Sequence, residues 1–415
     1  MLDIQFIREN TEKVKKGVTA KQIDASLVDQ VLELDAKRRK LIAEVEELRE
    51  KRNKIAKEGK ASEEGKKIKE ELKDKGSELS KVEEEYKDAL SQIPNLPAGD
   101  VKEGKDESQN DVVRSWGEPE KFDFKVRDHL DLGEALGVID VERAAKVSGT
   151  RFGYLKGDAA LLEFALVQFA LENLIKEGFT PVIPPVLIKK KSMWGMGYLE
   201  HGGEENMYVL EKDNLILVGT SEQSLGPMHA GETLPASKLP LRYVGFSPCF
   251  RREAGTYGKD TRGIMRVHQF DKVEMFSFTK PEDSDKEHEY LLSLEERLLQ
   301  ALKIPYRLVK MCSGDLGAPA ARKYDLEAFM PGQGEYREVT STSNTTDFQA
   351  RRLGIKYQNG DKADYVHTLN GTAFAIGRTI IAILENYQQK DGSVVIPEVL
   401  RKWVGKDKIT PLLDK

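Results

Sequence analysis

Residues 250–274 read FRREAGTYGKDTRGIMRVHQFDKVE and form the most informative stretch of the sequence. Two strand-like segments flank a polar, glycine-containing loop, which predicts a β-hairpin. Side chains two residues apart leave a strand on the same face, so Arg251 and Glu253 share one face of the incoming strand. Arg266, Phe270 and Glu274 likewise share a face of the outgoing strand. Because guanidinium groups bind paired phosphate oxygens and a Phe ring can stack on adenine, the hairpin is a candidate nucleotide clamp.

Alternation alone does not select among the side chains of this hairpin. His268 and Lys272 occupy the same face as Arg266, and an ordinary charged hairpin with one core Phe would show the same pattern. The assignment of a nucleotide site therefore depends on other segments of the chain.

Composition narrows the class of protein. The 415 residues suffice for two or three domains, and 65 Lys and Arg against 70 Asp and Glu give a net charge of -5, so any nucleic-acid surface must be local. Cys249 and Cys312 are the only cysteines, which supports neither a disulfide framework nor a zinc site. The sequence shows no signal peptide and no apolar run long enough for a membrane span. We expect a cytoplasmic protein without a membrane partner.

Apolar residues at heptad spacing indicate a long arm. One seam runs from Leu27 to Ile55 and a second from Ile68 to Ile93, which predicts an antiparallel two-helix coiled coil over residues 27–93, about 45 Å long. Residues 49–69 carry nine Lys or Arg against four Glu, a net of +5. A basic tip suits contact with a phosphate backbone, although any charged coiled coil has a solvated face.

A change in composition marks the end of the arm. Prolines, glycines and polar residues from Pro94 to residue 111 predict a linker, so we expect an N-terminal domain over residues 1–105 and a second domain over 106–415. Residues 1–26 are expected to form a short helical lead that packs on the second domain.

The second domain is predicted to be α+β, with an antiparallel sheet flanked by helices. Asp158 is expected to cap a helix that extends to Lys176, and the proline-rich segment 179–188 to lie at a sheet edge or a subunit boundary. The glycine patterns of dinucleotide-binding and P-loop folds do not occur. Further strands are predicted at 241–252, 265–278, 306–311, 336–344 and 364–371, and further helices near 281–302 and 373–387.

Two late segments supply further nucleotide-binding chemistry. Glu338 and Ser341 offer the hard oxygen ligands that Mg²⁺ accepts beside phosphates. Arg378 falls in the first turns of a predicted helix, where the helix N-terminus already favours anions.

Together these segments resemble class II aminoacyl-tRNA synthetases, and within them the seryl-tRNA synthetases of the bacterial type. Pro185 matches the family's first motif, at the dimer interface; Arg251 through Glu274 match the second, and Gly371 through Arg378 the third. In seryl enzymes a two-helix arm precedes this core, as it does here. The resemblance covers nearly the whole chain, and the order of the motifs makes it specific.

The resemblance implies ATP-dependent formation of seryl-adenylate. Arg251 would hold the α-phosphate, Glu253 the adenine or ribose side, and Phe270 would stack on adenine, while Arg266 and Arg378 would grip the outer phosphates. Arg251 and Arg378 are the candidate catalytic residues, and Glu338 and Ser341 would coordinate Mg²⁺. The full candidate ATP site consists of Arg251, Arg252, Glu253, Arg266, Val267, Phe270, Glu338, Val339, Thr340, Ser341 and Arg378.

The resemblance also implies a serine site and a tRNA acceptor. Glu274 would hold the ammonium group of L-serine; relatives commonly have Ser where this chain has Thr372, and Ala where it has Ser221. The candidate serine site consists of Thr220, Ser221, Glu222, Glu274, Asn370 and Thr372. The expected acceptor is tRNA(Ser), with tRNA(Sec) as a further candidate, and the expected assembly is a homodimer. The arm residues expected to contact tRNA are Arg49, Lys51, Arg52, Lys54 and Lys57.

Two other functions remain open at this point. A synthetase-like ligase could activate a small amino acid and load it onto a carrier protein or another acceptor, but such relatives tend to lack an arm. A catalytically silent binding protein could retain the fold, but Arg251, Glu274, Glu338 and Arg378 would then be free to change, and all four are present.

Overall fold

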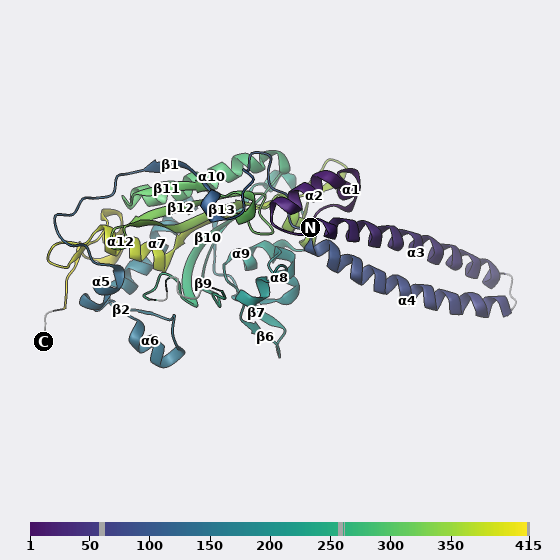
Figure 1. Ribbon diagram of the computed structural model, residues 1–415, viewed down its shortest axis with the longest axis horizontal. Helices are drawn as coiled ribbons and strands as arrows, with labels where there is room; N and C mark the ends of the chain where they lie inside the picture. The colour runs from purple at the N-terminus through teal and green to yellow at the C-terminus, as the bar shows by residue number, and fades with distance from the viewer. Residues whose placement is uncertain (58–62, 256–259, 261, 413–415) are drawn as a thin grey trace. The chain divides into compact units, whose positions relative to one another are not determined.

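The computed structural model describes residues 1–57, 63–255, 260 and 262–412, and divides into two compact units, Met1–Leu96 and Pro97–Lys415 (Figure 1). The division lies before residue 105, the boundary expected from composition. The backbone N–H of Ala98 donates to Ala321 O at 2.9 Å, and that of Gly104 to Ser313 Oγ at 3.2 Å. The expected linker is therefore divided: residues 94–96 belong to the first unit, and the linker from Pro97 onward belongs to the second.

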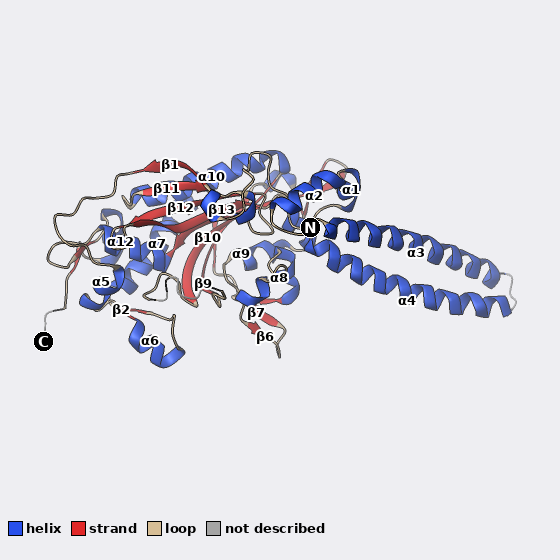
Figure 2. Cartoon of the chain, viewed as in Figure 1, coloured by secondary structure: helices blue, strands red, loops and turns tan. Residues whose placement is uncertain are grey.

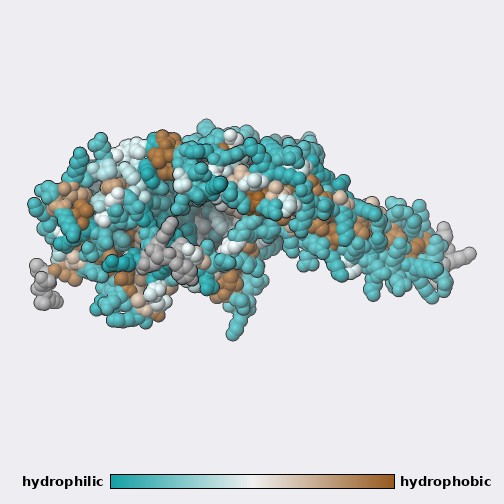
Figure 3. All heavy atoms as spheres, in the orientation of Figure 1, coloured by the Kyte–Doolittle hydropathy of each residue, from teal (hydrophilic) through white to brown (hydrophobic). Residues whose placement is uncertain are grey.

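The first unit contains the expected arm, formed by the antiparallel helices α3 (Ser26–Lys57) and α4 (Glu63–Gln92) (Figure 2). Leu41, Val45 and Leu48 are buried in the seam between the helices, as the heptads predict. The solvent-facing surface is mostly hydrophilic, with apolar residues along the strip between the helices (Figure 3). The structure therefore confirms the coiled coil.

Near its base the seam includes a buried charge that the heptad pattern does not reveal. Asp35 is 1% exposed, and its carboxylate accepts from Arg8 Nε at 2.8 Å and from Arg39 Nε at 3.1 Å. Leu34, which the heptad assigns to the seam, is only half-buried. The ion pairs with Arg8 and Arg39 make burial of a carboxylate at this position tolerable.

Helices α1 (Ile4–Glu9) and α2 (Thr11–Ala20) complete the first unit. Ile7, Val14 and Val18 are fully buried against the base of the arm, in a cluster that includes Val31 and Ile93. Residues of this lead therefore pack on the base of the arm within the first unit, and the packing of residues 1–26 on the second domain stays a prediction.

The second unit is built on an eight-stranded sheet, which confirms the predicted fold class. Every neighbouring pair is antiparallel except β4 with β9. In spatial order the strands are β1 (Asp111–Trp116), β11 (Tyr306–Lys310), β12 (Arg322–Met330), β13 (Glu335–Asn344), β16 (His367–Ala375), β10 (Gln269–Thr279), β9 (Leu241–Phe250) and β4 (Thr180–Val182).

Three long helices share the main hydrophobic core with this sheet: α7 (Asp158–Lys176), α10 (Ser284–Ala301) and α12 (Ile376–Asn386). The predicted end of α7 at Lys176 is confirmed, but its N-cap is Gly157. Asp158 is the first helical residue, and its carboxylate pairs instead with Lys406 Nζ at 2.7 Å. The proline-bearing strand β4 lies at the sheet edge, as expected for a residue that cannot donate to a strand ladder.

Among the helices in the described part of the chain, none combines the length and the apolar character that a bilayer-spanning segment requires.

Two carboxyl groups meet where α7 approaches β10. Glu163 and Asp271 share a hydrogen bond; burial, and then the negative charge of Asp271, raise the pKa of Glu163 to about 8, against 4.5 for an ordinary Glu. Burial also raises the pKa of Asp271. Between these two pKa values the folded protein retains a proton that the unfolded chain releases. The raised pKa of Glu163 therefore has little effect on the free energy of unfolding below pH 4.5, and it lowers that free energy increasingly as the pH rises to about 8.

Replacing Glu163 with Gln should therefore remove a pH-dependent loss of stability. We expect Glu163→Gln to match the parent protein near pH 4.5 and to exceed its unfolding free energy near pH 8, as measured by denaturant titration at several pH values. Glu172→Gln, on the same helix, is the matched control, because Lys402 and Lys176 lower the pKa of Glu172. A Glu163→Gln variant that is no more stable than its parent at high pH would contradict the assignment.

Candidate active site

Two adjoining cavities open over β10, β13 and β16 and bring most of the predicted site together. The first contains every candidate ATP residue except Arg252, together with Ile264, Met265 and Gly377. The second contains Thr220, Glu222, Glu274 and Asn370 of the candidate serine site. Both cavities are lined by Arg251, Glu253, Arg266, Lys272, Glu338 and Ser341. A nucleotide and an amino acid bound in these cavities would therefore meet along a charged wall.

Arg251 and Glu253 reach the cavities from beyond the end of β9. The strand ends at Phe250, and Glu253 adopts a positive φ of 49°. Arg251 Nε donates to Gly219 O at 3.1 Å, and its guanidinium lies 5.1 Å from the centre of the Phe270 ring. Arg252 lines a different cavity, together with His268. Its guanidinium carbon lies 6.0 Å from the centre of the Tyr208 ring.

Arg266 precedes β10, which begins at Gln269, so the strand-parity argument does not apply to it. Its Nη1 nevertheless donates to Glu253 Oε2 at 3.2 Å across the mouth of the hairpin. Arg251, Glu253 and Arg266 thus lie outside the two strands, where alternation in the sequence does not predict the direction of a side chain.

Arg378 is the third residue of α12 and faces the first cavity. Its Nη1 donates to Glu338 Oε2 and to Glu338 O, both at 2.9 Å. The Glu338 side chain is 44% exposed at the cavity mouth. Its partial withdrawal from water would raise its pKa, but the positive charges of Arg378 and Lys323 outweigh this effect and lower the pKa to about 2. The site thus holds an ionised carboxylate beside a guanidinium that can also bind phosphate.

Glu274 lies at the floor of the second cavity and is 1% exposed. Its Oε2 accepts from Lys272 Nζ at 2.8 Å and from Thr372 Oγ1 at 3.0 Å. Burial raises the pKa of Glu274, and the charge of Lys272 opposes that rise. Lys272 therefore belongs to the candidate site, whereas strand parity could not choose between Lys272 and its neighbours. The sequence signal that could have identified it is a lysine within a strand that also carries several large apolar residues.

Glu222 brings a second carboxylate to the same cavity. Its Oε1 accepts from Tyr198 Oη at 2.8 Å, and both residues line the cavity wall with Thr220 and Asn370. Tyr198 has no motif that would identify it in the sequence. Ser221 is fully buried and its Oγ lies 2.8 Å from Ser247 Oγ on β9, so its hydroxyl is directed into the protein.

The remaining predictions concern a metal and the arm. Glu338 and Ser341 both face the two cavities from β13, and two oxygen ligands suffice for a Mg²⁺ ion that takes its other ligands from phosphates and water. Among the described residues, no group of three or more His, Cys, Asp or Glu side chains is arranged to hold a metal ion.

The basic arm residues lie exposed in the last turns of α3: Arg49, Lys51, Arg52, Lys54 and Lys57.

Comparison with known protein families matches both units. Residues 1–97 match the seryl-tRNA synthetase N-terminal domain, and residues 208–387 match the tRNA synthetase class II core domain (G, H, P, S and T). The serine-tRNA ligase of Acidothermus cellulolyticus is 49% identical over 99% of this chain and 100% of its own length.

Solved structures agree over the whole chain. The crystal structure of seryl-tRNA synthetase from Pyrococcus horikoshii complexed with ATP superimposes with a TM-score of 0.93 and 43% identity, covering all of both chains. The cytoplasmic serine-tRNA ligase from Naegleria fowleri in complex with AMP gives a TM-score of 0.90 and 36% identity, covering 100% of this chain and 99% of its own.

Proposed function

The chain belongs to the seryl-tRNA synthetase family, a family of class II ATP-dependent ligases, and from this premise we propose that it activates L-serine with ATP and transfers the serine to the 3′ end of tRNA(Ser). The observation that carries the proposal is the junction of the two cavities. There Arg251 lines both the pocket that bears Phe270 and Arg378 and the pocket that contains Glu274. The relative from Pyrococcus horikoshii holds ATP.

The first step needs positioning and positive charge rather than a protein nucleophile. The carboxylate of serine attacks the α-phosphorus of ATP, and the bond to pyrophosphate breaks. Negative charge grows on the phosphoryl oxygens, and Arg251, which lines both cavities, would stabilise it. Arg378 would bind the outer phosphates. Glu338 and Ser341 would hold Mg²⁺, which neutralises phosphate charge when bound.

The second cavity accounts for the choice of serine. The ammonium group would bind between Glu274 and Glu222, and Thr220 and Asn370 offer polar partners for the rest of the amino acid. A buried polar pocket leaves its own groups unpaired when the ligand lacks a hydroxyl, so alanine and glycine would bind poorly. Threonine would be excluded by lack of room.

We propose tRNA as the acceptor of the activated serine because of the basic residues of the arm. Its exposed Arg49, Lys51, Arg52, Lys54 and Lys57 suit the phosphate backbone of tRNA(Ser), and tRNA(Sec) is proposed as a second acceptor. Cys249 and Cys312 are both free and buried, which fits the proposed cytoplasmic location.

We also propose a homodimer formed through α7 and the neighbouring edge of the sheet. Phe164 is 63% exposed, Ile175 50% and Ile183 88%, which is a large apolar surface for a soluble chain to leave in water. Phe164→Asp is expected to convert the dimer to monomer in sedimentation velocity, because the substitution would bury a charge at the interface. Val147→Asp, on α6 (Val141–Ser148), is the matched control, since Val147 is also exposed, at 72%. A parent protein that sediments as an active monomer would refute the dimer.

The proposed reaction is tested by exchange of labelled pyrophosphate into ATP without tRNA. Serine should support exchange, and threonine, alanine and glycine should not. Serine-dependent exchange followed by charging of a carrier protein rather than tRNA would correct the acceptor. No exchange with any of these amino acids would overturn the proposal in favour of a silent binding protein.

A further inference from the structure

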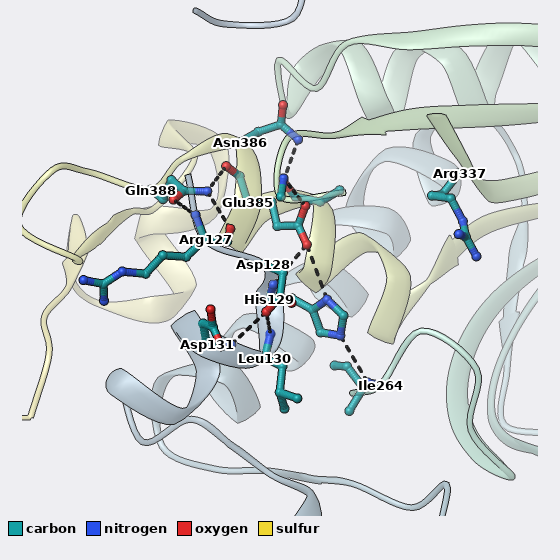
Figure 4. Close-up of polar contacts among 12 residues, drawn as sticks. Arg127, Asp128, His129, Leu130, Asp131, Ile264, Arg337, Glu385, Asn386 and Gln388 are labelled. Carbon is teal, nitrogen blue, oxygen red and sulfur yellow. Dashed lines mark hydrogen bonds and ion pairs between the residues drawn. The ribbon is translucent and has the colours of Figure 1, made fainter. Parts of the chain in front are cut away.

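A buried histidine–glutamate pair lies outside the residues assigned to the site (Figure 4). His129 begins α5 (His129–Ala135), and Glu385, which is 0% exposed, lies near the end of α12. Glu385 Oε1 accepts the backbone N–H of His129 at 3.0 Å and lies 3.3 Å from His129 Nδ1. Its Oε2 accepts the backbone N–H of Gly332 at 2.8 Å. The carboxylate is thus held from both sides.

The other ring nitrogen of His129 contacts the hairpin that forms the nucleotide pocket. The backbone N–H of Ile264 donates to His129 Nε2 at 3.3 Å. A nitrogen that accepts a hydrogen bond carries no proton, so this contact assigns the ring proton to Nδ1, where it faces Glu385. The result is a directed chain of hydrogen bonds from Ile264 through His129 to Glu385.

Gly263 shows how closely the imidazole packs on this segment. The residue has a φ of +73°, and a Cβ atom placed there would lie 2.0 Å from His129 Nε2. Any side chain at position 263 would therefore displace the ring from Ile264. The glycine before Ile264 is required by this contact as well as by its backbone conformation.

The segment that His129 contacts is one wall of the nucleotide pocket, since residues 264–267 all line the first cavity. Side chains of helix α12 hold two successive residues of this wall, Ile264 and Met265. Arg378 Nε donates to Met265 O at 3.4 Å, while Glu385 reaches Ile264 through His129. Residues 378 and 385 are seven positions apart, about two helical turns, and so lie on one face of α12.

We propose that His129 and Glu385 are positioning residues for ATP, which fix the wall formed by residues 264–267 at the place where the nucleotide binds. Neither residue faces either cavity, so neither is catalytic. The inference rests on the proposed function for its substrate. A purely structural role would lower stability and affect ATP and serine alike, whereas a positioning role affects ATP selectively.

Two conservative variants separate these roles. The amide of His129→Asn can replace Nδ1 and keep the contact with Glu385, but it cannot reach Ile264. The longer His129→Gln side chain can replace Nε2 and accept from Ile264. We expect His129→Asn to weaken ATP binding about tenfold in calorimetry and to raise the KM for ATP equally in pyrophosphate exchange, with the KM for serine changed less than about twofold. His129→Gln should retain most of the affinity for ATP.

His288 offers a matched control, because it is also a fully buried histidine and lies on α10, away from the wall. His288→Asn should lose stability without a selective effect on ATP. Unchanged ATP affinity in a folded His129→Asn variant, or equal losses in His129→Asn and His129→Gln, would overturn the inference. Calorimetry needs no serine, so a parent chain that binds ATP but catalyses no exchange would refute the proposed function and leave this test intact.

Discussion

Glu274→Gln is expected to lower kcat/KM for serine at least about 100-fold in pyrophosphate exchange and to leave the KM for ATP within about twofold. The carboxylate is 1% exposed, and its Oε2 is already engaged by Lys272 and Thr372. Removal of one partner from a buried charge pair costs about 3–5 kcal/mol, because the remaining charge is left unpaired. In this variant Lys272 loses its carboxylate partner, and the ammonium of serine keeps only that of Glu222.

The hydroxyl at position 372 provides a graded control for this prediction. Thr372→Val removes only a neutral donor to Glu274 and should cost about tenfold, while Thr372→Ser keeps the hydroxyl and should be nearly silent. The measurement is the steady-state rate of exchange against serine concentration at saturating ATP. Equal losses of serine and ATP affinity in Glu274→Gln would show that the carboxylate maintains the fold of the cavity instead of binding the amino acid.

The long helices could be predicted from the sequence because their apolar period continues over many turns. Helix α7 ends at the predicted residue, and the heptads place Leu41, Val45 and Leu48 in the seam of the arm. Strand β12 could not be predicted in this way. It sits inside the sheet yet carries a buried Asp325, which is tolerated because Lys323 Nζ lies 3.3 Å from its carboxylate. The sequence alone does not show that the charge of Asp325 is balanced by Lys323, because this depends on where the two side chains lie in the folded protein.

The same limit applies to the site. Alternation in strands brings Phe270 and Glu274 to one surface, but Arg251 and Arg266 lie beyond the strand ends, where alternation has no meaning. Strand parity singled them out on a premise that the structure does not support, and the resemblance of the whole hairpin to a family supplied their expected roles. Lys272 remained undecided because its role depends on burial beside Glu274, and His129 has no motif at all.

Removal of the outer arm should separate the two halves of the proposed reaction. We expect a chain in which a short Gly-Ser linker replaces residues 40–85 to catalyse serine-dependent pyrophosphate exchange within about twofold of the parent, and to lose tRNA charging. The helices are adjacent at the cut, because the Arg38 guanidinium lies 5.4 Å from the Tyr86 ring. The base also keeps its own core, which includes Ile7, Val31 and Ile93. Adenylate formation that fails in this chain would show that the arm does more than bind the acceptor.

The charge of the arm is tested without shortening it. Replacing Arg49, Lys51, Arg52, Lys54 and Lys57 with Gln should weaken tRNA binding by up to about a thousandfold and reduce its salt dependence, since each lost phosphate contact removes a released counterion. Lys73, Lys81 and Lys87 on α4 are the matched control, because they lie among acidic residues. If the deletion abolishes charging and the five substitutions do not, tRNA must recognise the length and surface of the coiled coil rather than these charges.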